Sequence, residues 1–360
     1  MNLIINLSHK INNMKKRVIL IFSLILFTGI FLNAQENKKY KGVCIGFYNL
    51  ENLFDTFDDT LKNDEQFLPN GSYSWTQERF QEKLNNMAEV IAKIGTDINP
   101  EGVSILGVSE IENRFVLEEL VKTDALKDRN YKIVHFDSPD FRGVDNGLIY
   151  QEKYFKVIAA KAYKLSIPEI EDFATRDQIL VSGLVENDTV HIIVNHWPSR
   201  RGGEKRSRPR RIEAAKISRH ISDSIFSVQP NAKIIIMGDL NDNPTDVSIK
   251  KYLKAKGKKD ELKDNELYNP YESLFKKGFG SNAYRDVWSL FDQIIVSSSL
   301  VGNDYSKLTM IRPSIFKRNF LLQQNGKYKG YPNRTYGAGV YMGGYSDHFP
   351  VYLFLIKEIN

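Results

Sequence analysis

The chain has 360 residues, of which 42% are hydrophobic and 26% are charged, and its formal charge is +6. This is an ordinary globular composition, large enough for one sizeable core or two modest ones. Because Cys44 is the single cysteine, an internal disulfide is excluded, and its place in the apolar run 43–48 predicts a buried side chain.

The N-terminus is typical of a secretory signal peptide. Three basic residues at 15–17 precede an uncharged apolar run at 18–32, which is shorter than the ~20 residues of a spanning helix. We expect residues 1–34 to be removed by cleavage near Ala34–Gln35, leaving one domain over 35–360 in a secreted or periplasmic protein. An uncleaved membrane anchor is the alternative. Cleavage would remove four basic and no acidic residues, which lowers the formal charge to +2. Any nucleic-acid argument must then rest on local basic patches.

Strand-like apolar runs dominate the remaining chain. Two of them are separated by Asn187-Asp188, a pair that tolerates positive φ and predicts a hairpin, so part of the sheet should be antiparallel. The predicted strands are Val43–Tyr48, Val103–Ser109, Tyr131–Phe136, Gly147–Tyr150, Phe155–Leu165, Gln178–Glu186, Thr189–Asn195, Lys233–Met237, Gln293–Ser297 and Pro350–Ile356.

Helical patterns are fewer. Residues 76–94 form an amphipathic pattern with Thr76 as N-cap, and further helices are predicted over 208–224 and 245–255. The polar stretches 257–270 and 323–345 are expected to be loops. Many strands, few helices and no dividing linker favour one domain of packed sheets flanked by helices.

Polar side chains suited to phosphate chemistry stand where these strands end. In GDLNDNP, Asp239 and Asn241 follow an apolar strand, so the carboxylate could deprotonate a water while the amide holds a phosphate oxygen. In SDHFP, Asp347 and His348 precede the last strand, where the acid could bind a cation and the imidazole a phosphoryl oxygen. Each motif alone could also be a simple turn.

Three further strand ends carry candidates. Glu110 follows a buried strand and is a natural ligand for a hard cation, with Glu112 as a runner-up, and Asn49 could bind the cation or hold Glu110 in place. His196 follows the strand 190–194. Asp292 precedes the strand 293–297 and could fix the tautomer of His348. Solvated acids, an Asx-turn and a core histidine are the alternatives.

Taken in order, these residues resemble the endonuclease/exonuclease/phosphatase superfamily, which includes pancreatic-type deoxyribonucleases, abasic-site endonucleases, neutral sphingomyelinases and inositol polyphosphate phosphatases. The resemblance covers roughly residues 40–357, and the runs VNHWPSRRGG and SEIEN are similar to a secreted bacterial branch. One departure is Ser109, where the family often has Gln before the metal-binding Glu. The resemblance rests on Asn49, Glu110, His196, Asp239, Asn241, Asp292, Asp347 and His348.

The resemblance implies an α/β fold, a four-layer α-β-β-α sandwich of two mixed sheets flanked by helices. It also implies roles: metal binding by Asn49, Glu110 and Asp347, and catalysis by His196, Asp239, Asn241, Asp292 and His348. Oxygen ligands without a Cys or His cluster favour Mg²⁺ or Mn²⁺, with Ca²⁺ also open. The expected activity is metal-dependent phosphodiester hydrolysis by a monomer without a stable protein partner.

The substrate is less well determined by the sequence. An Arg-rich segment begins just after His196, and we expect Arg200, Arg201, Arg208 and Arg211 to grip the phosphates of a polyanion, which favours DNA or RNA. A phospholipid, sphingomyelin or inositol phosphate fits nearly as well. The apolar residues at 315–322 could enter a membrane, although burial is the simpler explanation. A catalytically silent phosphate-binding protein of this fold is the third alternative.

Overall fold

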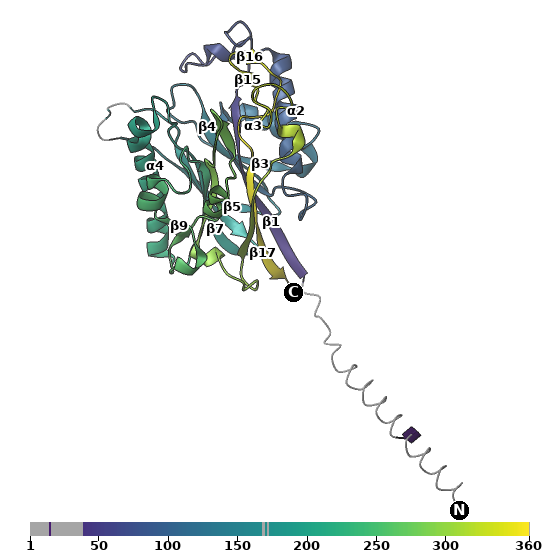
Figure 1. Ribbon diagram of the computed structural model, residues 1–360, viewed down its shortest axis with the longest axis vertical. Coiled ribbons are helices and arrows are strands. Elements are labelled where there is room, and N and C mark those ends of the chain that lie inside the picture. The colour runs from purple at the N-terminus through teal and green to yellow at the C-terminus, as the bar shows by residue number, and fades with distance from the viewer. Residues whose placement is uncertain (1–13, 16–38, 168–169, 171–172, 360) are drawn as a thin grey trace, which may run out of the picture. The chain divides into compact units, whose positions relative to one another are not determined.

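The computed structural model describes residues 14–15, 39–167, 170 and 173–359 (Figure 1). Tyr40–Glu358 forms one compact unit, and the other unit, residues 1–39 and 359–360, lies almost wholly outside the described residues. The predicted signal peptide therefore lies outside them too, except at positions 14 and 15. Within the described ranges, no helix is both long and apolar enough to cross a membrane.

Two large mixed sheets carry the fold. In the first, β1 and β2 run parallel, whereas β14 with β17, β2 with β4 and β3 with β4 run antiparallel. In the second, β7 with β8 and β9 with β10 are the parallel pairs. The first sheet has the order β14 (Thr309–Ile315), β17 (Val351–Ile359), β1 (Lys39–Leu53), β2 (Ile105–Ile111), β4 (Asp145–Gln151), β3 (Tyr131–His135). The second has the order β5 (Lys156–Tyr163), β6 (Gln178–Val185), β7 (Asp188–His196), β8 (Lys233–Asp239), β13 (Asp292–Ser297), β10 (Leu267–Tyr268), β9 (Ala255–Lys256).

Helices and short elements complete the chain. Two small hairpins pair β11 (Asn282–Tyr284) with β12 (Val287–Ser289) and β15 (Tyr336–Gly337) with β16 (Val340–Tyr341). The α-helices are α2 (Gln77–Lys93), α3 (Arg114–Lys122), α4 (Glu204–Val228) and α5 (Tyr271–Lys276). Single turns are η1 (Glu65–Phe67), η2 (Lys127–Arg129), η4 (Lys259–Glu261), η5 (Ser298–Leu300) and η6 (Asn319–Leu321), and η3 (Ser248–Leu253) is a π-helix.

Three buried cores stack these elements into four layers. The middle core joins the two sheets, with Phe47 of β1 in the same cluster as Met237 of β8. Leu84 of α2 belongs to the core between its helix layer and the first sheet, and Ala215 of α4 belongs to the core on the second sheet. Figure 1 shows α4 on one side of the sheets and α2 with α3 on the other. The predicted α-β-β-α sandwich is therefore confirmed.

All ten predicted strands are present, and Cys44 is buried as expected. Thr76 caps α2, because its side chain accepts a hydrogen bond from the backbone N–H of Arg79. The hairpin prediction was shifted by one residue: Val185 pairs with Asp188, so the turn consists of Glu186 and Asn187, both at positive φ.

Other element predictions need correction. Helix α4 begins four residues earlier than predicted, and the helix expected over 245–255 is only the short π-helix η3. Helix α3 and strand β14 were not predicted. Strand β14 carries Pro313 beside Arg312 at φ 54°, and its register shifts there, so this stretch does not read as a regular strand.

Candidate functional site

Strand register gathers three of the candidate side chains at one edge of the second sheet. The last residue of β7, His196, is the register partner of Asp239 at the end of β8. Asp239 is in turn the partner of Asp292, the first residue of β13. These three residues thus lie side by side because parallel and antiparallel neighbours all reach the same edge.

The first sheet meets this edge through a distorted pair of strands. The prediction that Asn49 and Glu110 end their strands was wrong: β1 continues to Leu53, β2 continues to Ile111, and both registers shift here. Glu51, Asn52 and Glu110 have φ values of 48°, 52° and 56°, a conformation that is uncommon outside glycine. Bulges and left-handed residues cluster at functional sites, where they re-aim side chains.

Asn49 connects the two sheets. Its amide nitrogen donates to Oδ2 of Asp239 at 3.1 Å, while its amide oxygen accepts from the backbone N–H of Glu51 at 2.9 Å. Both ends of the amide are thus engaged within the protein. In this arrangement Asn49 positions Asp239, and its amide oxygen keeps a second lone pair, so its role as a metal ligand stays a prediction.

Asp239 is buried and has an unusual pKa. Burial, reinforced by nearby Asp292, raises the pKa of Asp239 to about 7, although the charge on His348 opposes the rise. Its Oδ1 accepts from the backbone N–H of Asn241 at 3.0 Å, and its Oδ2 lies 3.8 Å from Nε2 of His348. A carboxylate with a pKa near neutrality can take up a proton during a reaction.

His348 is held as a cation. Its Nδ1 lies 2.7 Å from Oδ2 of Asp292, which also accepts from the Ser281 hydroxyl at 2.5 Å. Burial by itself lowers the pKa of His348, but the Asp292 and Asp239 carboxylates outweigh it and hold the pKa well above its usual value. The expected pairing of Asp292 with His348 is therefore present in the structure.

His196 has the opposite character. Burial and the charges of Arg176 and Arg142 hold its pKa well below the usual value, so the ring is neutral. Its Nε2 lies 3.7 Å from both Oε1 of Glu110 and Oδ2 of Asp239. In the described part of the chain, its buried Nδ1 has no hydrogen-bond partner. Asn241 lies beside it, and its amide donates to the carbonyl of Trp197 at 3.0 Å.

A second acidic group lies on the side of the first sheet. Burial and the neighbouring Asp347 raise the pKa of Glu51 to about 7. Arg334 bridges the two acids at 3.0 Å from each, and the backbone N–H of Thr335 donates to Glu51 at 2.7 Å. Beneath them, burial lowers the pKa of Lys83 to about 8, although Glu51 and Asp347 oppose this.

The donor chemistry of this group suits a hard divalent cation, although among the described residues the side chains at this site whose ligand atoms converge are Asp239, Asp292 and His348. Glu51, Glu110 and Asp347 offer only carboxylate oxygens, and all three act electrostatically on Arg334 and Lys83. The sequence singled out Glu110 and Asp347 but missed Glu51, Lys83 and Arg334. Glu51 could have been found, because it stands two residues after Asn49 on the predicted strand face.

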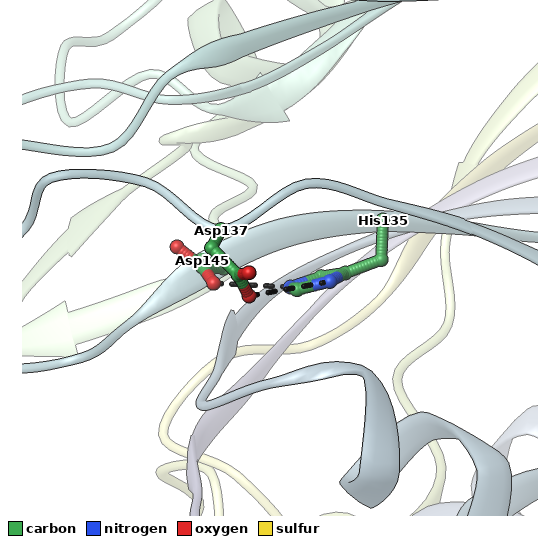
Figure 2. A group of neighbouring side chains, drawn as sticks. All are labelled: His135, Asp137 and Asp145. Carbon is green, nitrogen blue, oxygen red and sulfur yellow. Dashed lines mark hydrogen bonds and ion pairs between the residues drawn. The ribbon is translucent and has the colours of Figure 1, made fainter. Parts of the chain in front are cut away.

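A separate cluster of possible metal ligands lies on the first sheet (Figure 2). His135 of β3 lies 3.0 Å from Oδ2 of Asp145 on β4, and Asp137, from the following loop, approaches its other nitrogen at 3.8 Å. Oδ1 of Asp145 accepts from the backbone N–H of Ser138. These hydrogen bonds fix the loop after β3 to strand β4, which explains the cluster as a structural contact.

The Arg-rich segment differs from its expected role. Arg211 is fully buried, with its Nε 2.7 Å from Asp242, so it cannot meet a substrate, and the prediction for this residue is corrected. Arg200 also binds Asp242, at 3.0 Å, and Arg208 pairs with Glu204 one helical turn away. Of the four predicted phosphate ligands, Arg201 alone is exposed without an ion pair among the described residues.

The apolar residues at 315–322 do not form an exposed loop. Phe316 and Leu321 are 2% exposed and belong to the core under α2. Glu112, the runner-up metal ligand, is buried beside Asp55, whose backbone N–H donates to it at 2.7 Å. Burial and the Asp55 charge raise the pKa of Glu112 to about 8.

Solved structures with this fold span almost the whole domain. A zebrafish (D. rerio) TDP2 complexed with a single-strand DNA product has a TM-score of 0.51 and 14% identity, covering 88% of this chain and 99% of that one. A mannosyl-6-phosphatase from Bacteroides thetaiotaomicron has a TM-score of 0.51 and 16% identity, covering 87% and 99%. An endonuclease/exonuclease/phosphatase family protein from the same organism has a TM-score of 0.51 and 16% identity, covering 89% and 100%.

Sequence comparison places the chain more directly. None of the curated proteins matches it. The family model described as Endonuclease/Exonuclease/phosphatase family matches residues 44–357, a range that contains every strand-edge residue discussed above. With the sandwich fold and that match together, the chain belongs to the endonuclease/exonuclease/phosphatase family.

Proposed function

We propose that this protein is a secreted, divalent-metal-dependent phosphodiesterase that cleaves DNA or RNA, most simply as an endonuclease. The observation that carries the proposal is the close approach of two buried titratable side chains, Asp239 and His348, at the shared sheet edge. Asp239, with a pKa of about 7, lies 3.8 Å from a His348 ring that Asp292 keeps protonated. A general base and a cationic hydrogen-bond donor that face the same small space are well suited to promote the attack of water on a phosphate ester.

In this proposal each side chain has a definite task. Asp239, steadied by Asn49 and Asn241, takes the proton of the attacking water. His348, held by Asp292 through Nδ1, donates its remaining Nε2–H to a phosphoryl oxygen as negative charge grows on it. The neutral His196 ring, at the end of the neighbouring parallel strand β7, offers a further contact to a phosphoryl oxygen.

A divalent cation, Mg²⁺ or Mn²⁺, would be held by Glu51, Glu110 and Asp347 and would supply charge neutralisation at the phosphate. Arg334 now spans two of these acids, so we propose that it moves toward the phosphate when the cation binds. Secretion rests on the composition of residues 1–34, with basic residues followed by an apolar run.

A substrate panel tests the proposal. Purified mature protein with Mg²⁺ or Mn²⁺ is incubated with single-stranded and duplex DNA, RNA, sphingomyelin, inositol phosphates and hexose phosphates, with Asp239→Ala as control. Metal-dependent cleavage of nucleic acid that Asp239→Ala lacks supports the proposal. Turnover of only the lipid or the sugar phosphates would remove the nuclease claim.

An inositol phosphate phosphoesterase is the second candidate, because most of the Arg-rich segment is already paired with acids. Arg200 and Arg211 both contact Asp242, so fewer guanidinium groups remain for a long polyanion than the sequence suggested. A membrane-inserting lipid enzyme is less well supported, since the apolar side chains of Phe316 and Leu321 are buried.

A further inference from the structure

A cavity of about 740 Å³ lies beside the acidic group and plays no part in the chemistry described so far. Arg334 and Asp347 line it, so it is continuous with the candidate site. The hairpin β11–β12 forms part of its wall, and the polar loop that ends in β15 and β16 forms the rest. Its volume is in the range of small-molecule binding sites.

Tyrosine rings dominate this cavity. Tyr284 is 69% exposed and Tyr328 is 47% exposed, and the ring centre of Tyr331 lies 5.5 Å from that of Tyr328. A cation accompanies each outer ring: Arg285 lies over Tyr284 at 5.2 Å and Lys327 over Tyr328 at 5.6 Å. Exposed aromatic faces with cations beside them form a stacking surface suited to planar groups on a negatively charged chain.

The hairpin is held in a fixed shape at its tip. Its two turn residues, Arg285 and Asp286, have φ values of 48° and 65°, as a two-residue hairpin turn of this kind requires. The Tyr331 hydroxyl donates to the Asp286 carboxylate and accepts from its backbone N–H, both at 2.6 Å. Tyr331 thereby ties the loop wall of the cavity to the hairpin.

The root of the same hairpin contacts the candidate catalytic residues. The Asn282 amide donates to the backbone carbonyl of Asp347 at 3.0 Å, and the hydroxyl of Ser281, just before the hairpin, donates to Asp292. One short element therefore carries Tyr284 at its tip and supports the partner of His348 at its base. A group stacked in the cavity would be placed at a fixed distance from the phosphate position.

We propose that this cavity binds a nucleobase of a single-stranded polynucleotide, next to the phosphate that is cleaved. This proposal rests on the proposed nuclease function and locates a binding site for part of its substrate. Tyr284 and Tyr328 stack against the base, and Arg285 and Lys327 face the adjoining phosphates. A hexose or inositol would need free polar partners for its hydroxyl groups. Two of the charged groups in the wall are instead engaged within the protein, Asp286 by Tyr331 and Arg334 by Glu51 and Asp347.

The test compares two fluorescent oligonucleotides of equal length, oligo(dT) and the same chain with abasic tetrahydrofuran residues, cleaved by the full mature protein with Mn²⁺. The variants are Tyr328→Ala and Tyr284→Ala. Tyr40→Ala is the matched control, because Tyr40 is also 47% exposed but lies at the start of β1, about 30 Å of strand away from Asn49.

We expect wild-type protein to cleave oligo(dT) roughly 10-fold more efficiently, in kcat/KM, than the abasic chain. Tyr328→Ala and Tyr284→Ala should each reduce this preference by lowering the rate on oligo(dT) more than the rate on the abasic chain, and Tyr40→Ala should keep the wild-type preference. Equal wild-type rates on the two chains, or an equal loss on both in Tyr328→Ala, would overturn the base-stacking assignment while leaving a nuclease. Cleavage of neither chain would overturn the nuclease function itself, and with it this site.

Discussion

The replacement of Arg211 by methionine separates a structural role from a substrate-binding role. The Arg211 guanidinium has no exposed surface and is anchored by Asp242 at 2.7 Å and by the Ser207 hydroxyl at 2.9 Å. Removing one partner of a buried ion pair typically costs about 3–5 kcal/mol. We expect the lower value, about 3 kcal/mol, because Arg200 and Ser248 still contact Asp242.

This loss converts to a measurable shift in Tm. At roughly 2.1 cal/mol/K per residue, the unfolding entropy of a domain of about 320 residues is about 0.7 kcal/mol/K, so Arg211→Met should lower the Tm by about 4–5 °C. Thermal unfolding followed by circular dichroism measures the shift. Arg208→Met is the matched control, because Arg208 makes an exposed pair with Glu204 one turn away, and its loss should leave the Tm almost unchanged.

The same two variants test function. Where folded, Arg211→Met should keep the wild-type KM for an oligonucleotide. An unchanged Tm combined with a raised KM would refute the structural assignment and return Arg211 to the substrate-binding surface.

Three further predictions follow from the buried titratable side chains His348, Asp239 and Glu112. Asp292→Asn should lower kcat by about 100-fold or more and shift the alkaline limb of the pH–rate profile to lower pH, because His348 loses the carboxylate that raises its pKa; an unaltered limb would contradict the pairing. The pH–rate profile should rise on its acid side with a midpoint at about pH 7, because Asp239 must ionise to act as the base. A bound cation would favour the ionised form and could only lower this midpoint. A midpoint above pH 8 would exclude Asp239 as the base. The folded pKa of Glu112 is raised to about 8, so its ionisation destabilises the fold as pH rises from about 4.5 to 8. Urea unfolding should therefore show Glu112→Gln equal to wild type at pH 4.5 and more stable by a few kcal/mol at most at pH 8.5, while equal stability at both would count against the shift.

Much of the fold could be predicted because burial imposes a period on the sequence. The apolar runs of β1, β7 and β8 lie between the sheets or under α4, so they read plainly as strands. Strand β14 could not be recognised, because Pro313 interrupts its pattern at a bulge. The shifted hairpin turn has a similar origin: Glu186 takes a left-handed conformation that its residue type does not favour.

The candidate site was predictable where it follows strand ends and unpredictable where it depends on tertiary packing. His196, Asp239 and Asp292 meet because neighbouring strands share an edge. Lys83 left a signal that was missed, since a lysine three residues after Phe80 falls on the apolar face of α2. Arg334 left none, because it lies in a loop without periodicity.

Arg211 shows the opposite error. A run of arginines near a candidate site favours phosphate binding when only the sequence is considered. The buried partner, Asp242, lies in the GDLNDNP segment, and its contact with α4 becomes visible only once the helix is packed on the second sheet.

The most direct test of the central claim is the cleavage rate of a fluorescent single-stranded oligonucleotide by wild type and Asp239→Asn, measured with Mg²⁺ and again after EDTA. The asparagine keeps the size of the side chain and can still accept from Asn241, but it cannot take a proton. The account predicts cleavage by wild type only with metal, and a rate at least about 100-fold lower for Asp239→Asn under the same conditions. Comparable rates for the two proteins, or wild-type cleavage that EDTA leaves intact, would contradict it.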